Sequence, residues 1–142
     1  MQHHSRHARP SAIPALGRTM LAILFLCSGI EKVVDPNHTL EAIRAVGLPF
    51  AHLGLAIAIL LGLGGGAMLA LGIRTRMVAT VLAIYCVVAG ILFHNPFEGI
   101  HQAIQLIKNI AIAGGLLQVA AFGAGGYAFD RIRSGRKIIH EA

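Results

Sequence analysis

Four apolar runs constrain the fold of this chain more than any other feature of its sequence. They cover about residues 15–33, 50–73, 77–94 and 102–127. Each has the roughly 17–25 residues that a helix needs to cross the hydrocarbon core of a bilayer, and none shows the strict alternation of a strand. A helix also satisfies its own backbone hydrogen bonds, as lipid requires. The sequence therefore predicts an all-α integral membrane protein, a bundle of four transmembrane helices.

The composition agrees with the lipid bilayer as the surroundings of these helices. Charged residues make up 13% of the 142 residues, whereas about 25% is usual in soluble domains. The net charge of +6 could suggest nucleic acid, but the basic residues lie in short tails and one tight loop, so we expect no nucleic-acid partner. The two cysteines, Cys27 and Cys86, lie within apolar runs and are expected to pack as small hydrophobic side chains.

The charge pattern divides the chain into three parts. Residues 1–14 are predicted to be a disordered basic tail, residues 15–130 the transmembrane domain, and residues 131–142 a second basic tail. No small-x-small cleavage site follows the first apolar run, so we expect that run to be retained as a helix.

Lysine and arginine residues also predict the orientation. Arg18 and the turn "RTR" at 74–76 lie on the same side as both tails, whereas residues 95–101 contain no Lys or Arg. Because connections rich in Lys and Arg face the cytoplasm, both termini are predicted to be cytoplasmic. The loops at 34–49 and 95–101 are then outside.

The first outer loop has structure of its own. In "DPNHTLEAIRAVGLP", Asp35 and Pro36 suit the N-cap and the first position of a helix. Leu40, Ile43 and Val46 recur at a spacing of three, which places them near one another on the helix surface. The pattern predicts a short interfacial helix lying on the outer membrane surface.

Glycines in two of the runs indicate close helix packing. Gly62 and Gly66 are four residues apart in the second run, and Gly114 and Gly115 are adjacent in the fourth. Small residues let the backbones of membrane helices approach each other. These four glycines are therefore predicted to lie in helix contacts.

Polar residues from all four helices are expected to meet in the outer half of the bundle. His101, Gln105 and Lys108 are spaced i, i+4, i+7 and so share one face of the fourth helix. The expected polar cluster consists of Glu31, Lys32, His52, His94, His101, Gln105, Lys108 and Asn109. Ionisable groups inside a membrane span are candidates for a functional pocket.

Three interpretations of Lys108 stay open. Its long side chain can extend to the interface and keep its charge in water. It can form a structural ion pair with Glu31, joining the first helix to the fourth. It can also help to bind a ligand in a pocket between the helices.

A metal site is not expected in this cluster. His94 and His101 are seven residues apart with Glu98 between them, and His52 can come near, but the spacing matches no standard zinc pattern. No Ser/His/Asp or Cys/His set suited to nucleophilic catalysis emerges either. Whether the chain is an enzyme therefore stays open.

Several stretches together resemble a known family. In order they are "GRTMLAILFLCSGIEKVVDP", "AVGLP", "LALGIRTR", "ILFHNPF", "LIKNIAIAGGLL" and "GAGGYAFD", within about residues 16–130. They resemble the DoxX family of small bacterial inner-membrane proteins, with the pairs Phe93–His94 and Lys108–Asn109 as the most specific pieces. The resemblance implies a four-helix bundle in the bacterial inner membrane.

The resemblance leaves two functions of different classes. Some members are associated with membrane redox complexes that handle thiols, which implies an accessory, non-catalytic component of a quinone- or thiol-linked redox system. No cofactor is evident, but quinone is a candidate ligand for Glu31, His94, Lys108 and Asn109. The alternative is a membrane scaffold or assembly partner that binds other membrane or redox proteins, or a second copy of itself. One departure weakens a catalytic role: members often carry a glutamate in the second helix, where this chain has Gly62.

Overall fold

The computed structural model describes residues 12–125 and 127–130 of the protein. Its elements are α1 (Ile13–Val34), α2 (Pro36–Ala45), α3 (Ala51–Ile59), the π-helix η1 (Leu60–Gly65), α4 (Gly66–Leu71), α5 (Thr75–Phe93), the 3-10 helix η2 (Pro96–Glu98) and α6 (Ile100–Phe122). The tails predicted at 1–14 and 131–142 lie outside the described residues, except that α1 already begins at Ile13.

Four helices of the described chain are long and apolar enough to span a membrane. They run over Ile13–Val34, Ala51–Leu71, Thr75–Phe93 and Ile100–Phe122, and residues 12–125 and 127–130 include no strand. The predicted all-α fold with four candidate spans is therefore confirmed. The fourth span is shorter than the predicted run to residue 127, because Gly123 has a φ of +81°, a left-handed conformation that ends a helix.

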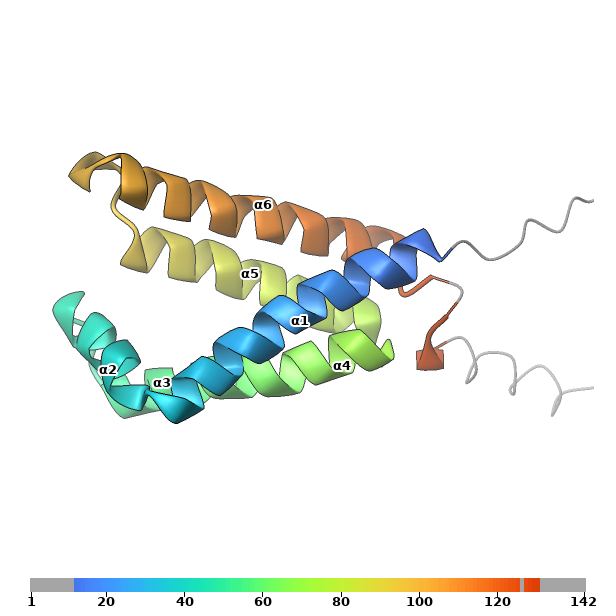
Figure 1. Cartoon of the computed structure of the whole chain (residues 1–142), viewed down its shortest axis with the longest axis horizontal. Coiled ribbons are helices and arrows are strands. Elements are labelled where there is room, and N and C mark those ends of the chain that lie inside the picture. Colours follow the sequence, from blue (N-terminus) through green and yellow to red (C-terminus); the bar gives the residue numbers. More distant parts are fainter. Residues whose placement is uncertain (1–11, 126, 131–142) are drawn as a thin grey trace, which may run out of the picture.

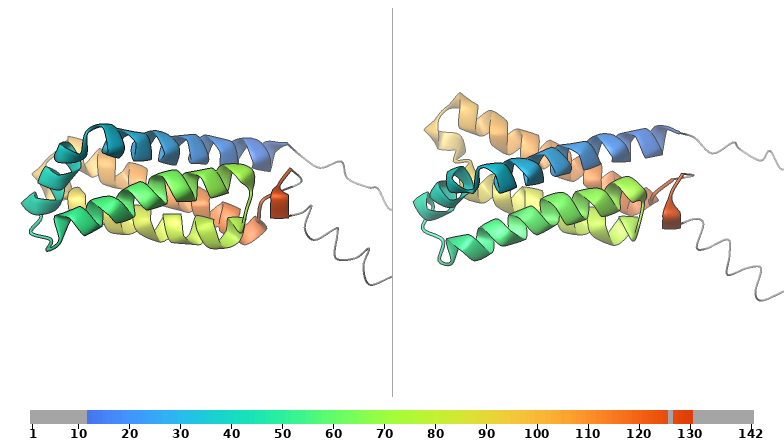
Figure 2. Two further views of the ribbon diagram at one scale, coloured as in Figure 1. Left: turned by 90° about the horizontal axis from the view of Figure 1, so that it is seen from below. Right: turned by 60° about the horizontal axis from the view of Figure 1, so that its bottom comes forward.

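The spans pack as two pairs joined through a common core. α5 and α6 lie side by side along most of their length, and α1 packs on the second span, formed by α3, η1 and α4 (Figures 1 and 2). The buried core contains Phe25 of α1, Leu69 of α4, Leu82 of α5 and Leu116 of α6. Each of the four spans thus contributes one large side chain to the same interior.

The two ends of the bundle differ in their charged residues, and we name them accordingly. The arginine end comprises the start of α1, the turn between α4 and α5, and the end of α6, with Arg18, Arg74 and Arg76. The histidine end comprises α2, the start of α3, η2 and the start of α6, with His38, His52, His94 and His101.

The tightest contact between spans joins α1 to η1. A Cβ added at Gly62 would lie 2.8 Å from the Cα of Gly29, and one added at Gly66 would lie 3.1 Å from Leu26 Cγ. The two backbones therefore touch where a side chain would keep them apart, which is the packing that small residues permit in membrane helices. Gly62 lies within the π-helical turns of η1, and Gly66 is the first residue of α4.

The helix expected in the first loop is present as α2. Asp35 is its N-cap and accepts a hydrogen bond from the N–H of His38, and Pro36 occupies the first turn. At its other end the N–H of Leu48 donates to the carbonyl of Ile43, a bond that satisfies one of the last carbonyls of the helix. Leu40 and Ile43 are buried against Leu55 of α3, so α2 packs on the bundle. That it lies on a membrane surface stays a prediction.

The close approach of α1 and η1 predicts different effects for two neighbouring glycines. Gly62→Ala should destabilise the bundle by about 1–3 kcal/mol, because the added methyl group overpacks against Gly29. Gly64→Ala should be neutral or slightly stabilising, because its Cβ would meet only Leu60, at 3.6 Å. Thermal unfolding of both variants in detergent measures the difference. Equal melting temperatures would contradict the predicted contact.

Candidate functional site

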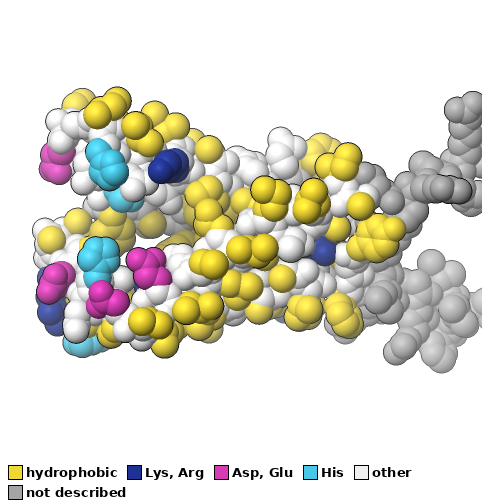
Figure 3. All heavy atoms as spheres, in the orientation of Figure 1, with side chains coloured by type: hydrophobic (Ala, Val, Ile, Leu, Met, Phe, Trp, Pro, Cys, Tyr) yellow, Lys and Arg dark blue, Asp and Glu magenta, His cyan; other side chains and the backbone are white. Residues whose placement is uncertain are grey.

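A hollow in the surface lies at the histidine end (Figure 3). α1 and α6 contact each other at the arginine end, where Leu21 faces Gly115. From there they diverge, so that α6 with α5 and α1 with α2 form two arms (Figure 1). The space-filling view shows a hollow between these arms, with His, Lys and acidic side chains on its walls (Figure 3). We call this hollow the polar cleft.

Lys108 belongs to the side of α6 that faces the polar cleft. His101, Lys108 and Gly115 follow one another at intervals of seven residues, so they lie on the same side of the helix. Gly115 faces Leu21 of α1, its nearest contact at 3.8 Å. Two turns further toward the histidine end, no helix of the described chain lies against the same side of α6 (Figure 1), and Lys108 is exposed. Gln105 adjoins this stripe and is half-buried.

Lys32 lies on the facing side of α1. Ser28 is seven residues after Leu21 and Lys32 is four residues after Ser28, so all three lie on the side of α1 that faces α6. The Nζ of Lys32 donates to the Ser28 hydroxyl at 2.7 Å and to the Ser28 carbonyl at 3.2 Å. The polar cleft is therefore bordered by an amine on each arm.

The ion pair between Glu31 and Lys108 is not formed. Both side chains are exposed, and neither makes an ion pair with the other in the described part of the chain. The physical reason is the divergence of α1 from α6, which keeps the two helices apart at this level. This interpretation of Lys108 is wrong for the described structure, whereas exposure to the interface and ligand binding both agree with its position.

Asn109 and His94 lie beside the cleft and not in its walls. A Cβ added at Gly90 of α5 would lie 3.0 Å from the Cβ of Asn109, so Asn109 packs between α5 and α6, and its amide donates to the Gln105 carbonyl. His94 Nδ1 is 3.0 Å from Gln102 Oε1. Because an amide oxygen only accepts, Nδ1 carries the proton in this hydrogen bond. Both residues thus hold α6 against α5.

The remaining predicted residues are two histidines of the polar cluster and two glycines of α6. His52 and His101 are exposed at the histidine end, and among the described residues no three His, Cys, Asp or Glu side chains are grouped to hold a metal ion. Gly115 faces α1, but a Cβ at Gly114 would meet nothing within 4 Å. The expectation of a helix contact at Gly114 is therefore not met within the described bundle, because this side of α6 faces outward.

Sequence reasoning missed a second polar site, at the arginine end. Arg18 is only 4% exposed although it lies one turn into α1. Its guanidinium donates to the carbonyl of Ala124, to that of Tyr127 at 2.7 Å and to that of Ala70 at 3.5 Å. One side chain therefore ties α1 to the end of α4 and to the chain that follows α6. An arginine inside an apolar run was the available signal, since such groups are rarely without partners.

Asp130 also makes contacts at the arginine end, where it joins the chain after α6 to the start of α5. Its carboxylate accepts hydrogen bonds from the N–H of Arg74 and from the N–H and hydroxyl of Thr75, each 2.9 Å long. Its own N–H donates to the carbonyl of Gly72 at 3.1 Å. Burial would raise the pKa of Asp130, but the hydrogen bonds from Thr75 and Arg74 and the charge of Arg18 lower that pKa below its ordinary 3.8.

Four apolar spans, a closed arginine end and an open polar cleft define a small helical membrane protein. Residues 13–95 match the model of the DoxX family. Inner membrane protein YqjF of Escherichia coli (strain K12) is 35% identical over 118 residues, which are 82% of this chain and 88% of that protein. Inner membrane protein YphA of the same organism is 26% identical over 129 residues, covering 87% and 91%. No solved structure matches the chain significantly.

The chain belongs to the DoxX family of inner membrane proteins. The resemblance found in the sequence is thereby confirmed. The family match ends at residue 95, so it includes α1 to α5 but not α6 with Lys108. The longer alignments with the two relatives extend the likeness over more of the chain.

The lowered pKa of Asp130 predicts acid sensitivity of the arginine end. A group whose pKa is lower in the folded state stabilises that state above its unfolded pKa, and the stabilisation is lost as the pH falls through the folded value. The wild-type protein should therefore lose stability below about pH 4. Asp130→Asn should lower the stability at neutral pH by about 1–2 kcal/mol, because hydrogen bonds to a charged acceptor are replaced by weaker ones.

Thermal unfolding in detergent at neutral and acidic pH measures both effects. The difference between wild type and Asp130→Asn should shrink as the pH falls, since the wild-type carboxylate then becomes protonated. Asp35→Asn is a suitable control, because Asp35 also accepts a backbone N–H, but at the histidine end. A constant difference across the pH range would show that the Asp130 charge does not stabilise the fold.

Proposed function

We propose that this protein is an accessory, non-catalytic membrane component of a quinone- or thiol-linked redox system, and that the polar cleft binds its small-molecule partner. The observation that carries the proposal is the pair of facing polar stripes, with Lys32 on α1 and Lys108 on α6. The two stripes border the polar cleft, and Lys108 is exposed in it. An ionisable group within a span is a functional candidate by default.

The groups that line the cleft suit a ligand that offers oxygen atoms. Lysine amines only donate hydrogen bonds, and a histidine can donate one from either ring nitrogen. A quinone head group presents two carbonyl oxygens, and an oxyanion such as thiosulfate adds negative charge. Lys108, His101 and Gln105 are the binding residues that we propose on α6, with Lys32 opposite them.

Two features support an accessory role over an independent catalyst. Cys27 is exposed on α1 and Cys86 is buried in α5, and the sequence contains no C-x-x-C motif of the kind found in redox-active pairs. Gly62 occupies the position where the family resemblance places a glutamate. A partner protein would then supply the redox centre, and this chain would hold the membrane-soluble or anionic substrate beside it.

A specific observation also favours the alternative of a membrane scaffold. α6 is the least buried of the four spans, and the side of α6 at Gly114 faces no other helix of the described chain. Such a face can pack against another membrane protein or a second copy. A scaffold needs no ligand in the polar cleft, so ligand binding separates the two functions.

The first prediction from this proposal concerns ligand binding to the purified protein in detergent. Thiosulfate and a short-chain ubiquinone are titrated separately, and at least one should bind saturably. Lys108→Ala should weaken that binding by at least tenfold, equivalent to about 1.4 kcal/mol, and Lys108→Arg should restore part of it. Arg74→Ala, which removes a cation from the opposite end, is the control and should bind like wild type. Absence of binding, or an unaffected Lys108→Ala, would favour the scaffold.

The second prediction concerns orientation, for which we propose both termini in the cytoplasm. The proposal is supported by the three arginines of the arginine end and by the basic residues that follow residue 130. Reporter fusions after residue 142 should then be active in the cytoplasm, and reporters inserted at residues 38 and 98 should be active outside. An external C-terminus would place the polar cleft on the cytoplasmic side and contradict the proposed topology.

A further inference from the structure

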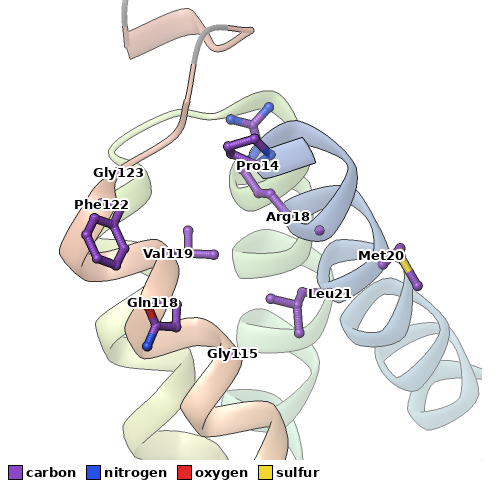
Figure 4. A pocket seen from close by; sticks show the side chains of 10 residues that line it. Pro14, Arg18, Met20, Leu21, Gly115, Gln118, Val119, Phe122 and Gly123 are labelled. Atoms are coloured by element: carbon purple, nitrogen blue, oxygen red, sulfur yellow. The ribbon is translucent and has the colours of Figure 1, made fainter. Parts of the chain in front are cut away.

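A second hollow lies at the arginine end, on the opposite half of the bundle from the polar cleft. It is a groove of about 530 Å³ between the start of α1 and the end of α6. Leu21, Val119 and Phe122 line it with apolar side chains, and Gly115 lies on its α6 wall (Figure 4). Gly17 also lines the groove and leaves it open. Its volume lies within the range of about 300–1,000 Å³ that is usual for small-molecule sites. We call it the arginine groove.

The arginine groove opens sideways, toward the hydrocarbon that surrounds the bundle. Met20 and Phe122 are 64% and 80% exposed at its edges. A Cβ added at Gly17 would meet nothing within 4 Å, so no described residue fills the space over this glycine. An apolar slot of this shape, open to the bilayer, suits an acyl chain.

One end of the groove carries a guanidinium that is incompletely hydrogen-bonded within the described residues. Arg18 lines the groove, and its Nε is buried without a hydrogen-bond partner among the described residues. A buried N–H without an acceptor is unfavourable, because it has lost its hydrogen bonds to water without replacing them. The other nitrogens of this guanidinium are already bonded to carbonyl oxygens. Because the surroundings are of low dielectric constant, the charge acts over several ångströms even where no direct contact is made.

A second guanidinium lies at the same end. Gly123 lines the groove, and a Cβ added there would lie 3.3 Å from the Nε of Arg76. Arg76 is exposed, and within residues 12–125 and 127–130 its side chain has no carboxylate partner. Asp130 is engaged instead by Thr75 and by the N–H of Arg74. Arg76 is therefore available to an anion at the end of the apolar slot.

We propose that the arginine groove binds one anionic phospholipid, with an acyl chain along Leu21 and Val119 and the phosphate at Arg76 and Arg18. Charge complementarity identifies the occupant, because an apolar slot that ends at two guanidiniums matches an apolar chain that ends in a phosphate. Basic pockets between membrane helices recognise anionic head groups in this way. The site is separate from the polar cleft and does not depend on the proposed redox role.

Native mass spectrometry of the detergent-purified full chain tests the proposal. Phosphatidylglycerol and phosphatidylcholine with identical acyl chains are added at equal concentration. The protein should retain one phosphatidylglycerol, at least tenfold more than phosphatidylcholine. Equal retention of the two lipids, or displacement of phosphatidylglycerol by equimolar ubiquinone, would overturn the proposal, the latter by showing that a neutral isoprenoid is preferred.

Two matched pairs of variants locate the bound lipid. Gly17→Leu fills the groove and should reduce phosphatidylglycerol retention by about tenfold, whereas Gly114→Leu, at a position equally open but outside the groove, should not. Arg76→Gln should reduce the preference for phosphatidylglycerol, whereas Arg74→Gln should leave it unchanged. Retention at the wild-type level in Gly17→Leu or in Arg76→Gln would overturn the proposal. The arginine pair keeps the test decisive if a glycine variant does not fold.

Discussion

The buried guanidinium of Arg18 is the interaction on which the shape of the bundle depends. A charge in apolar surroundings is strongly unfavourable unless oxygen atoms surround it. Arg18 obtains these oxygens from α4 and from the two carbonyls at Ala124 and Tyr127. The chain after α6 must therefore fold back over the start of α1, and Asp130 fixes it to the start of α5. Among the described residues, no comparable set of contacts joins α1 to α6 at the histidine end, so the two helices are free to diverge there.

Most of the fold could be predicted because its signals are local. The four spans are visible as apolar runs, and Asp35 with Pro36 marks the start of α2 through side-chain and backbone chemistry that involves only neighbouring residues. Gly62 and Gly66 lack side chains and therefore indicated a close helix contact, and the structure places both glycines against α1. The end of α6 was misjudged by five residues, since the apolar run continues after Gly123 while the backbone does not remain helical.

The polar sites were harder to predict because they depend on angles between helices. Spacing in the sequence places His101, Gln105 and Lys108 near one another on α6, but it could not show that α1 diverges from α6 at that level. The pair Glu31–Lys108 was wrong for this reason. The contacts of Arg18 and Asp130 join residues 52 to 109 positions apart, and neither periodicity nor local composition indicates which distant carbonyl an arginine will reach.

The glycine contact between α1 and η1 also bears on the glutamate that the family resemblance implies at position 62. With a Cβ at position 62 only 2.8 Å from the Gly29 Cα, an acidic side chain at this position is incompatible with the observed packing. A family member that carries glutamate here must hold its first two spans further apart and admit a polar group between them. In this chain the interior at the middle of the membrane is sealed where a relative of that kind would have a proton-carrying group.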